Sequence, residues 1–125
     1  SKGVTVGSLL VHITHGPDAP TRAALGFLIA KSASEAGHHV TVFCAGDAAY
    51  LLKDAVIEHT KGIGTGALSD SVPAVVSLGV PIYVSGGSSK TRGVTEADLK
   101  DKGATFATPQ QLVELTFGAD RVLCY

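Results

Sequence analysis

Residues 8–46 read SLLVHITHGPDAPTRAALGFLIAKSASEAGHHVTVFCAG, and the pattern of this stretch decides the fold. Ser8–Thr14 is a nearly continuous apolar run rich in β-branched residues, which is typical of a buried strand. After a turn, apolar residues recur at helical spacing from Thr21 to Ala36, and Gly37 ends that helix. His39–Cys44 is then predicted as a second strand. The stretch therefore predicts a strand, a helix and a second strand in succession.

The alternation of strands and helices continues to the C-terminus. We expect further strands at Val80–Val84, Ala104–Ala107 and Arg121–Cys124, and helical segments at Ala48–Lys53, from Ser69 or Asp70 to Gly79, from Thr95, and at Thr108–Phe117. This order is the signature of an α/β fold with a mainly parallel, buried sheet of five strands.

Local sequence signals place the ends of these helices. Asp18 is predicted to cap the first long helix, and Thr108 opens the last one as a capping box with proline at its first position. Pro73 must lie in the first turn of its helix. Residues 61–66 contain three glycines and are expected to form an irregular or mobile loop.

The composition narrows the classes of function. The chain has 125 residues, which predicts one domain over residues 1–125, and 45% of them are hydrophobic. Its net charge is −1, without a long basic run, so neither nucleic acid nor a membrane is an expected partner. Ser1–Val6 lacks the features of a signal peptide, so we expect a cytoplasmic protein.

The two cysteines, Cys44 and Cys124, match neither a disulfide framework nor a zinc-binding spacing. No metal and no cofactor is therefore predicted. For both thiols, packing in the core is the favoured interpretation. The alternative for Cys44 is a thiolate at a strand end that faces a helix N-terminus, where the pKa of the thiol would fall.

In a parallel sheet, ligands bind at the carboxyl ends of the strands. His15, Cys44, Ser85 and Cys124 stand at or near four such ends. His15 could act as an acid, a base or an anion binder near neutral pH. His12 lies within the first strand and is expected to be a core residue with its hydrogen bonds satisfied, while Asp47 is expected to cap the helix that follows it.

Residues 83–93, YVSGGSSKTRG, follow the third predicted strand. They fail the spacing of a Walker A loop, of GxGxxG and of GxSxG. One interpretation is an ordinary solvated turn, which is the more frequent role of such a composition. The other is an anion site, for which the candidate residues are Gly86, Gly87, Ser88, Ser89, Lys90 and Arg92.

Four pieces of the sequence together resemble the DsrE/DsrF-like family, which includes sulfur-relay subunits. They are the His15-Gly16 turn, EAGHHVTVFCAGDAAYLL (35–52), GVPIYVSGGSSKTRGV (79–94) and GADRVLCY (118–125). The resemblance implies a three-layer α/β/α sandwich with a five-stranded, mainly parallel sheet. It also implies a trimer or hexamer of like subunits.

Sulfur-relay members of this family carry a persulfide on a cysteine just after the third strand, eight residues before the glycine of an Arg-Gly pair. Arg92-Gly93 matches the pair, and counting back eight residues reaches Ser85. A serine hydroxyl cannot form a persulfide and is a poor nucleophile without a partner base. The resemblance thus implies a family member without persulfide chemistry at this position.

Three functions follow from these observations. The first is a small oligomeric protein that binds a small anionic ligand or a partner at the strand-end pocket without persulfide chemistry at Ser85. The second is a sulfurtransferase or sulfur carrier that uses Cys44. The third is a structural subunit that pairs with an active homologue, as a sulfur-relay partner would. Whether the protein is an enzyme stays open at this point.

Overall fold

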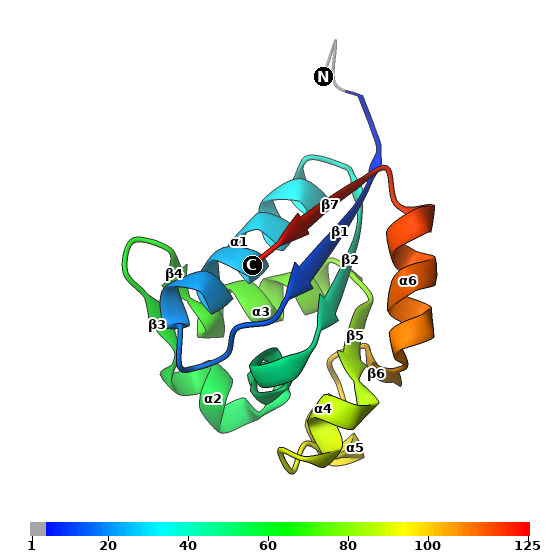
Figure 1. Ribbon diagram of the computed structural model, residues 1–125. Helices are drawn as coiled ribbons and strands as arrows, with labels where there is room; N and C mark the ends of the chain where they lie inside the picture. The colour runs from blue at the N-terminus through cyan, green and yellow to red at the C-terminus, as the bar shows by residue number, and fades with distance from the viewer. Residues whose placement is uncertain (1–4) are drawn as a thin grey trace.

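The computed structural model describes residues 5–125 and has a five-stranded parallel sheet at its centre (Figure 1). Residues 1–4, part of the predicted domain and of the stretch tested for a signal peptide, lie outside the described residues. The elements in chain order are β1 (Ser8–Ile13), α1 (Pro20–Glu35), β2 (His39–Cys44), the 3₁₀ helix η1 (Gly46–Leu52), α2 (Asp54–His59), β3 (Lys61–Gly62), β4 (Gly66–Ala67), α3 (Leu68–Ser77), β5 (Ile82–Ser85), α4 (Gly86–Lys90), α5 (Glu96–Leu99), β6 (Ala104–Ala107), α6 (Pro109–Gly118) and β7 (Arg121–Cys124).

The five strands lie in the order β6-β5-β2-β1-β7, and every neighbouring pair is parallel. The predicted α/β class and the five-stranded sheet are confirmed. The three central strands carry the apolar runs of the sequence, and Val11, Val42 and Val84 on them are fully buried. A parallel strand that is covered on both faces needs such a run, which explains the sequence pattern.

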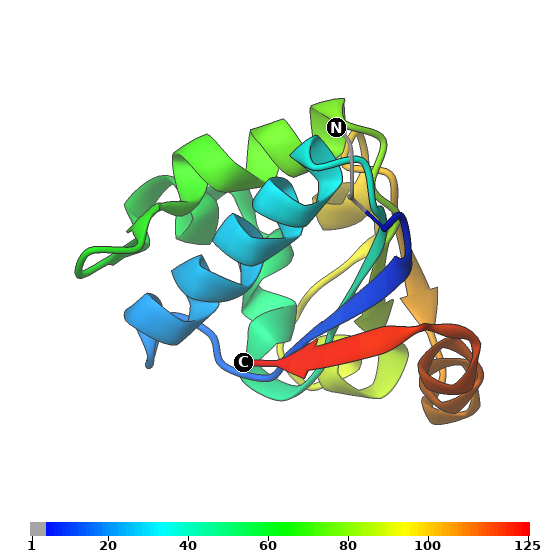
Figure 2. The ribbon, with the colours of Figure 1, turned by 90° about the horizontal axis from the view of Figure 1, so that it is seen from above.

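Helices cover the two faces of the sheet unequally. α1 and α3 lie on one face and α6 crosses the other, as the two views show (Figures 1 and 2). The main core lies between the sheet and α1 and α3, while a smaller cluster of Leu10, Phe43 and Ala107 packs under α6. No residue of α6 is fully buried, and all four residues of the edge strand β7 are exposed.

Several helix ends follow the sequence signals. Thr108 Oγ1 accepts a hydrogen bond from the Gln111 amide at 3.2 Å, and Gln111 Oε1 accepts one from the Thr108 amide at 2.8 Å. This is the predicted capping box at the start of α6. Gly37 and Gly79 follow α1 and α3 with φ of 92° and 74°, a conformation that favours glycine.

Two predicted helix caps are wrong. The N-cap of α1 is Ala19, because the Asp18 carboxylate accepts a hydrogen bond from the Gly16 amide instead. α3 starts at Leu68 rather than after Ser69 or Asp70. The Leu68 amide donates to the Thr60 carbonyl at 3.0 Å, so the helix begins directly where the preceding strand ends. Pro73 consequently lies inside the helix and not in its first turn.

The loop predicted at residues 61–66 is instead a short antiparallel hairpin of β3 and β4. Thr21 of α1 holds it in place: its hydroxyl accepts from the Ile63 amide, and its carbonyl accepts from the Thr65 hydroxyl. These contacts join residues more than 40 positions apart in sequence. The glycines therefore serve a fixed turn and not an irregular loop.

The longest helix of residues 5–125 is α1, with 16 residues. None of the helices in this part of the chain has the length and apolar character that crossing a membrane requires.

Candidate functional site

The carboxyl ends of β5, β2, β1 and β7 lie side by side at one edge of the sheet. We call this edge the rim and define it by His15, Cys44, Ser85 and Cys124, the residues predicted at or near the four strand ends. Strand β2 lies directly beside β5, and Cys44 pairs with Val84 in the register. The sheet topology therefore brings together the strand ends that the sequence singled out.

Ser85 is both the last residue of β5 and the N-cap of the short helix α4. Its Oγ accepts a hydrogen bond from the Ser88 amide at 3.1 Å. The Ser88 hydroxyl in turn accepts one from the Gly46 amide at 2.8 Å, which ties α4 to the start of η1. The stretch expected to be a loop therefore consists of the end of β5 and the short helix α4, which is hydrogen-bonded to η1. The Ser85 hydroxyl has a hydrogen-bond partner within the protein.

An ion pair connects the same two segments. Arg92 Nε and Nη2 both lie 3.0 Å from Asp47 Oδ1, and Arg92 Nη1 also donates to the Ser88 carbonyl at 3.2 Å. The guanidinium lies 5.9 Å from the centre of the Tyr50 ring, within the range of a cation–π contact. Asp47 does not cap η1 as expected, because its carboxylate pairs with Arg92.

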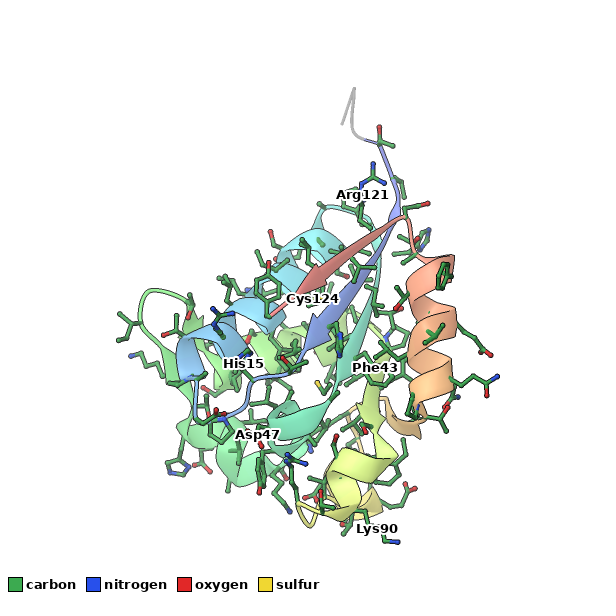
Figure 3. The ribbon with its side chains drawn as sticks, in the orientation of Figure 1. His15, Phe43, Asp47, Lys90, Arg121 and Cys124 are labelled. Atoms are coloured by element: carbon green, nitrogen blue, oxygen red, sulfur yellow. The ribbon has the colours of Figure 1, made fainter. Side chains whose placement is uncertain are left out.

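These contacts occupy much of the predicted anion site. The Ser88 amide and hydroxyl and the Arg92 guanidinium already have partners, and Ser89 is only 1% exposed. Gly86 and Gly87 open α4, while Lys90 lies at its end and projects outward, away from His15 (Figure 3). An anion at this place would have to compete with internal partners for its strongest donor.

Cys44 is fully buried in the main core. Burial raises the pKa of its thiol to about 12, because the charged thiolate would lose its hydration. The favoured core interpretation of Cys44 is therefore confirmed, and the alternative of a thiolate with a lowered pKa is wrong. Cys124 differs: it lies on the edge strand β7 and is exposed, so its expected packing role is wrong.

The two histidines of the first strand and its turn have different environments. His15 is half-buried, and its Nδ1 lies 3.4 Å from the Thr14 hydroxyl. His12 packs edge-on against Phe43, and its Nε2 is buried without a hydrogen-bond partner. The expectation that its hydrogen bonds are satisfied is therefore wrong. Burial also lowers the pKa of His12, which favours the neutral ring.

Sequence reasoning missed Asp47 and Tyr50 as partners of Arg92. The ion pair joins residues 45 positions apart, and no spacing in the sequence relates them. Only the adjacency of β2 and β5 brings η1 and α4 together, and strand order cannot be read from the pattern of apolar runs. A charged pair between two segments of this kind therefore had no signal in the sequence.

The match to a known family extends over nearly the whole chain. Residues 7–125 match the DsrE/DsrF-like family. The chain belongs to the DsrE/DsrF-like family. No curated protein sequence matches it. Its family membership accords with the predicted resemblance and makes it a relative of the sulfur-relay-like proteins.

Two solved structures are similar in fold. The ychN protein from E. coli matches with a TM-score of 0.77 and 17% identity, over 97% of this chain and 100% of that one. A conserved protein of unknown function from Bacteroides thetaiotaomicron matches with a TM-score of 0.65 and 14% identity, over 95% of each chain. At these sequence identities, the similarity shows that this DsrE-like chain and the two solved structures share a fold.

The tight contact at Gly16 generates the first prediction. A Cβ at this position would clash with the Asp47 carbonyl oxygen, so Gly16→Ala must displace the backbone that carries the Asp47–Arg92 pair. We expect a loss of about 1–3 kcal/mol in the free energy of unfolding, measured by urea denaturation. Gly87→Ala is the matched control, because its Cβ would meet only Ser85 Oγ at 4.0 Å. Equal stability of the two variants would contradict the close contact.

The two thiols are predicted to differ in reactivity. In the native protein, Ellman's reagent should modify Cys124 quickly and Cys44 only at the rate of unfolding, because Cys44 is buried with a raised pKa. Denaturant should make both thiols react. Cys124→Ser should remove the fast phase. A fast phase that persists in Cys124→Ser would show that the Cys44 thiol is accessible.

Proposed function

We propose that this protein is a DsrE-like subunit that acts by associating with other subunits and carries no persulfide at Ser85 or Cys44. The observation behind the proposal is the hydrogen bond from the Ser88 amide to Ser85 Oγ. At the position that corresponds to the sulfur carrier of the relay proteins, the side chain serves as a helix cap. The family relationship and this cap together favour a sulfur-relay-like assembly in which this chain is a subunit that does not carry sulfur.

The chemistry of the rim supports this proposal. Persulfide formation needs a thiolate that attacks a sulfane sulfur, and the Ser85 hydroxyl has no sulfur to offer. Cys44, the neighbouring candidate, has a pKa of about 12 and is fully buried. At neutral pH it would present almost no thiolate to a donor. The carrier function through Cys44 is therefore the weaker proposal.

The outer surface of the α6 face supports association. Val113 and Phe117 on α6 are 54% and 87% exposed, and Val122 on the edge strand β7, which pairs with Leu10 on the same face of the sheet, is 36% exposed. An edge strand also offers unpaired backbone groups to a partner. We propose that like subunits, as a trimer or hexamer, or a homologue that bears the carrier cysteine, cover part of this surface.

Binding of a small anion at the rim is the second candidate. Lys90 is exposed at the end of α4, and His15 is half-buried at the end of β1, so both could meet a ligand from solvent. Against it, an anion would have to displace Asp47 to reach Arg92. Association is therefore the stronger of the two candidate functions. For either function, the cytoplasmic location is still a prediction.

Sulfur loading tests the proposal at the rim. In a Cys124→Ser background, incubation with glutathione persulfide should add no sulfur to the intact protein, as measured by mass spectrometry. Adding Ser85→Cys to that background should allow uptake of one sulfur atom. The new thiol would lie beside the first amides of α4, which favour the thiolate form. Sulfur bound to Cys44 in the Cys124→Ser protein would overturn the proposal. Failure of Ser85→Cys to load would show that position 85 is not the carrier position.

Solution mass tests association. Light scattering should give a multiple of the chain mass of 12.7 kDa, and Phe117→Glu should lower it, because a charge would have to be desolvated at the contact. Ile63→Glu is the matched control, since Ile63 is 90% exposed at the tip of the β3–β4 hairpin. A monomeric wild-type protein, or an assembly that only Ile63→Glu dissociates, would contradict the proposed surface.

A further inference from the structure

A histidine holds the backbone just before β1. His38 Nδ1 accepts a hydrogen bond from the Gly7 amide at 3.1 Å, and the His38 amide is fixed to the Ala33 carbonyl at the end of α1. A ring nitrogen accepts a hydrogen bond only when it carries no proton, so this contact requires the neutral ring with its proton on Nε2. The protonated ring has a donor on each nitrogen and cannot accept from the Gly7 amide. The contact therefore exists in one charge state of His38 alone.

The residues next to Gly7 depend on this contact. Within residues 5–125, Thr5 and Val6 make no hydrogen bond to another residue, and Val6 is 57% exposed. Going along the described chain from residue 5, the Gly7 amide is thus the first group that is hydrogen-bonded, and His38 is its acceptor. Loss of that acceptor would free residues 5–7.

The chain beyond Gly7 is held by bonds that do not involve the His38 ring. The Gly7 carbonyl accepts from the His39 amide at 2.9 Å, and the Ser8 amide donates to Asp120 Oδ2 at 2.8 Å. The Asp120 amide in turn donates to the Ser8 carbonyl at 3.1 Å. A change in the His38 contact is therefore confined to residues 5–7 and leaves β1 in the sheet.

Residues 5–7 form part of a groove of about 670 Å³ beside the edge strand β7 (Figure 1). The groove is lined by residues 5–9, His38 and residues 120–123. Val6, Leu9 and Leu123 give it an apolar surface. Release of residues 5–7 would take away the part of the lining that they contribute, so the charge state of His38 bears on the shape of this groove.

Carboxylates outnumber cations around His38. The charged or titratable residues that share a groove lining with His38, or lie near it in the chain, are Glu35, His39, Tyr83, Glu114, Asp120 and Arg121. These surroundings accommodate a positive ring. A backbone hydrogen bond from Ser8 lowers the pKa of Asp120, so this carboxylate stays ionised over the pH range in which imidazole titrates. The Ser8–Asp120 contact therefore persists when His38 gains a proton.

We propose that His38 is a pH-sensitive latch, whose neutral ring holds residues 5–7 beside β7 and whose protonated ring releases them. As the pH falls through the range in which imidazole gains a proton, the Gly7 amide loses its acceptor. The His39–Gly7 and Ser8–Asp120 bonds stay in place, so β1 and β7 keep their positions. The latch depends neither on sulfur chemistry at the rim nor on association.

Nuclear magnetic resonance of the full chain at about pH 8 and about pH 5 tests the latch. The protection factor of the Gly7 amide against hydrogen exchange should be about two- to tenfold lower at the acidic pH, which is the effect of losing one net hydrogen bond. The heteronuclear NOE of Val6 should fall with it, while the amides of β2 keep their protection. Equal protection of Gly7 at the two pH values would overturn the proposal.

Three variants identify the ring that responds. His38→Asn supplies an oxygen near the place of Nδ1 that accepts but does not titrate, so Gly7 should be protected equally at both pH values. His38→Phe keeps a ring without an acceptor, and protection should be low at both. His39→Asn, at the exposed neighbouring position, is the matched control and should respond as the wild-type protein does. A pH response that persists in His38→Asn, full protection in His38→Phe, or loss of the response in His39→Asn would each contradict the latch.

Discussion

The common direction of the five strands is the constraint on which the rest of the structure depends. Because every neighbouring pair in the sheet is parallel, each long helix must run back against the strands. The carboxyl ends of the strands therefore gather at the rim, and the C-termini of α1, α3 and α6 gather at the opposite edge. Buried apolar runs such as that of β2 keep this arrangement fixed.

At the rim, the same geometry joins polar side chains of separate elements into a structural connection. Ser85 caps α4, Ser88 holds the Gly46 amide, and Arg92 pairs with Asp47 beside Tyr50. Polar groups that could have met a ligand instead satisfy one another between β5, α4 and η1. A hydroxyl at position 85 fits this role, since it accepts the amide hydrogen bond that an N-cap must accept. We therefore favour association through the exposed α6 and β7 surface over anion binding at the rim as the function of the chain.

Much of the fold could be predicted from the sequence. The strands were recognisable because buried parallel strands need long apolar runs, and the start of α6 was recognisable because Thr108 and Gln111 form a local capping box. The start of α3 was not, because the Thr60 carbonyl and not a side-chain cap receives its first amide. Local rules work where the partners are neighbours in the chain.

The candidate site was predictable only in part, for the same physical reason. The strand-end rule correctly predicted that the chosen strand ends lie at one edge of the sheet, but the Asp47–Arg92 pair and the exposure of Cys124 depend on strand order, which the pattern does not contain. Tertiary contacts decided both of these features.

Hydrogen exchange at the Ser88 and Gly46 amides measures most directly whether the polar groups of the rim are used internally. Both amides donate to side-chain hydroxyls, of Ser85 and Ser88 respectively, so both should be protected in the native protein and unaffected by added phosphate. Ser85→Ala should remove the protection of Ser88 while the core amides of β2 stay protected. Rapid exchange of both amides in the wild-type protein, slowed by phosphate, would contradict internal use of these groups and identify the rim as an anion site.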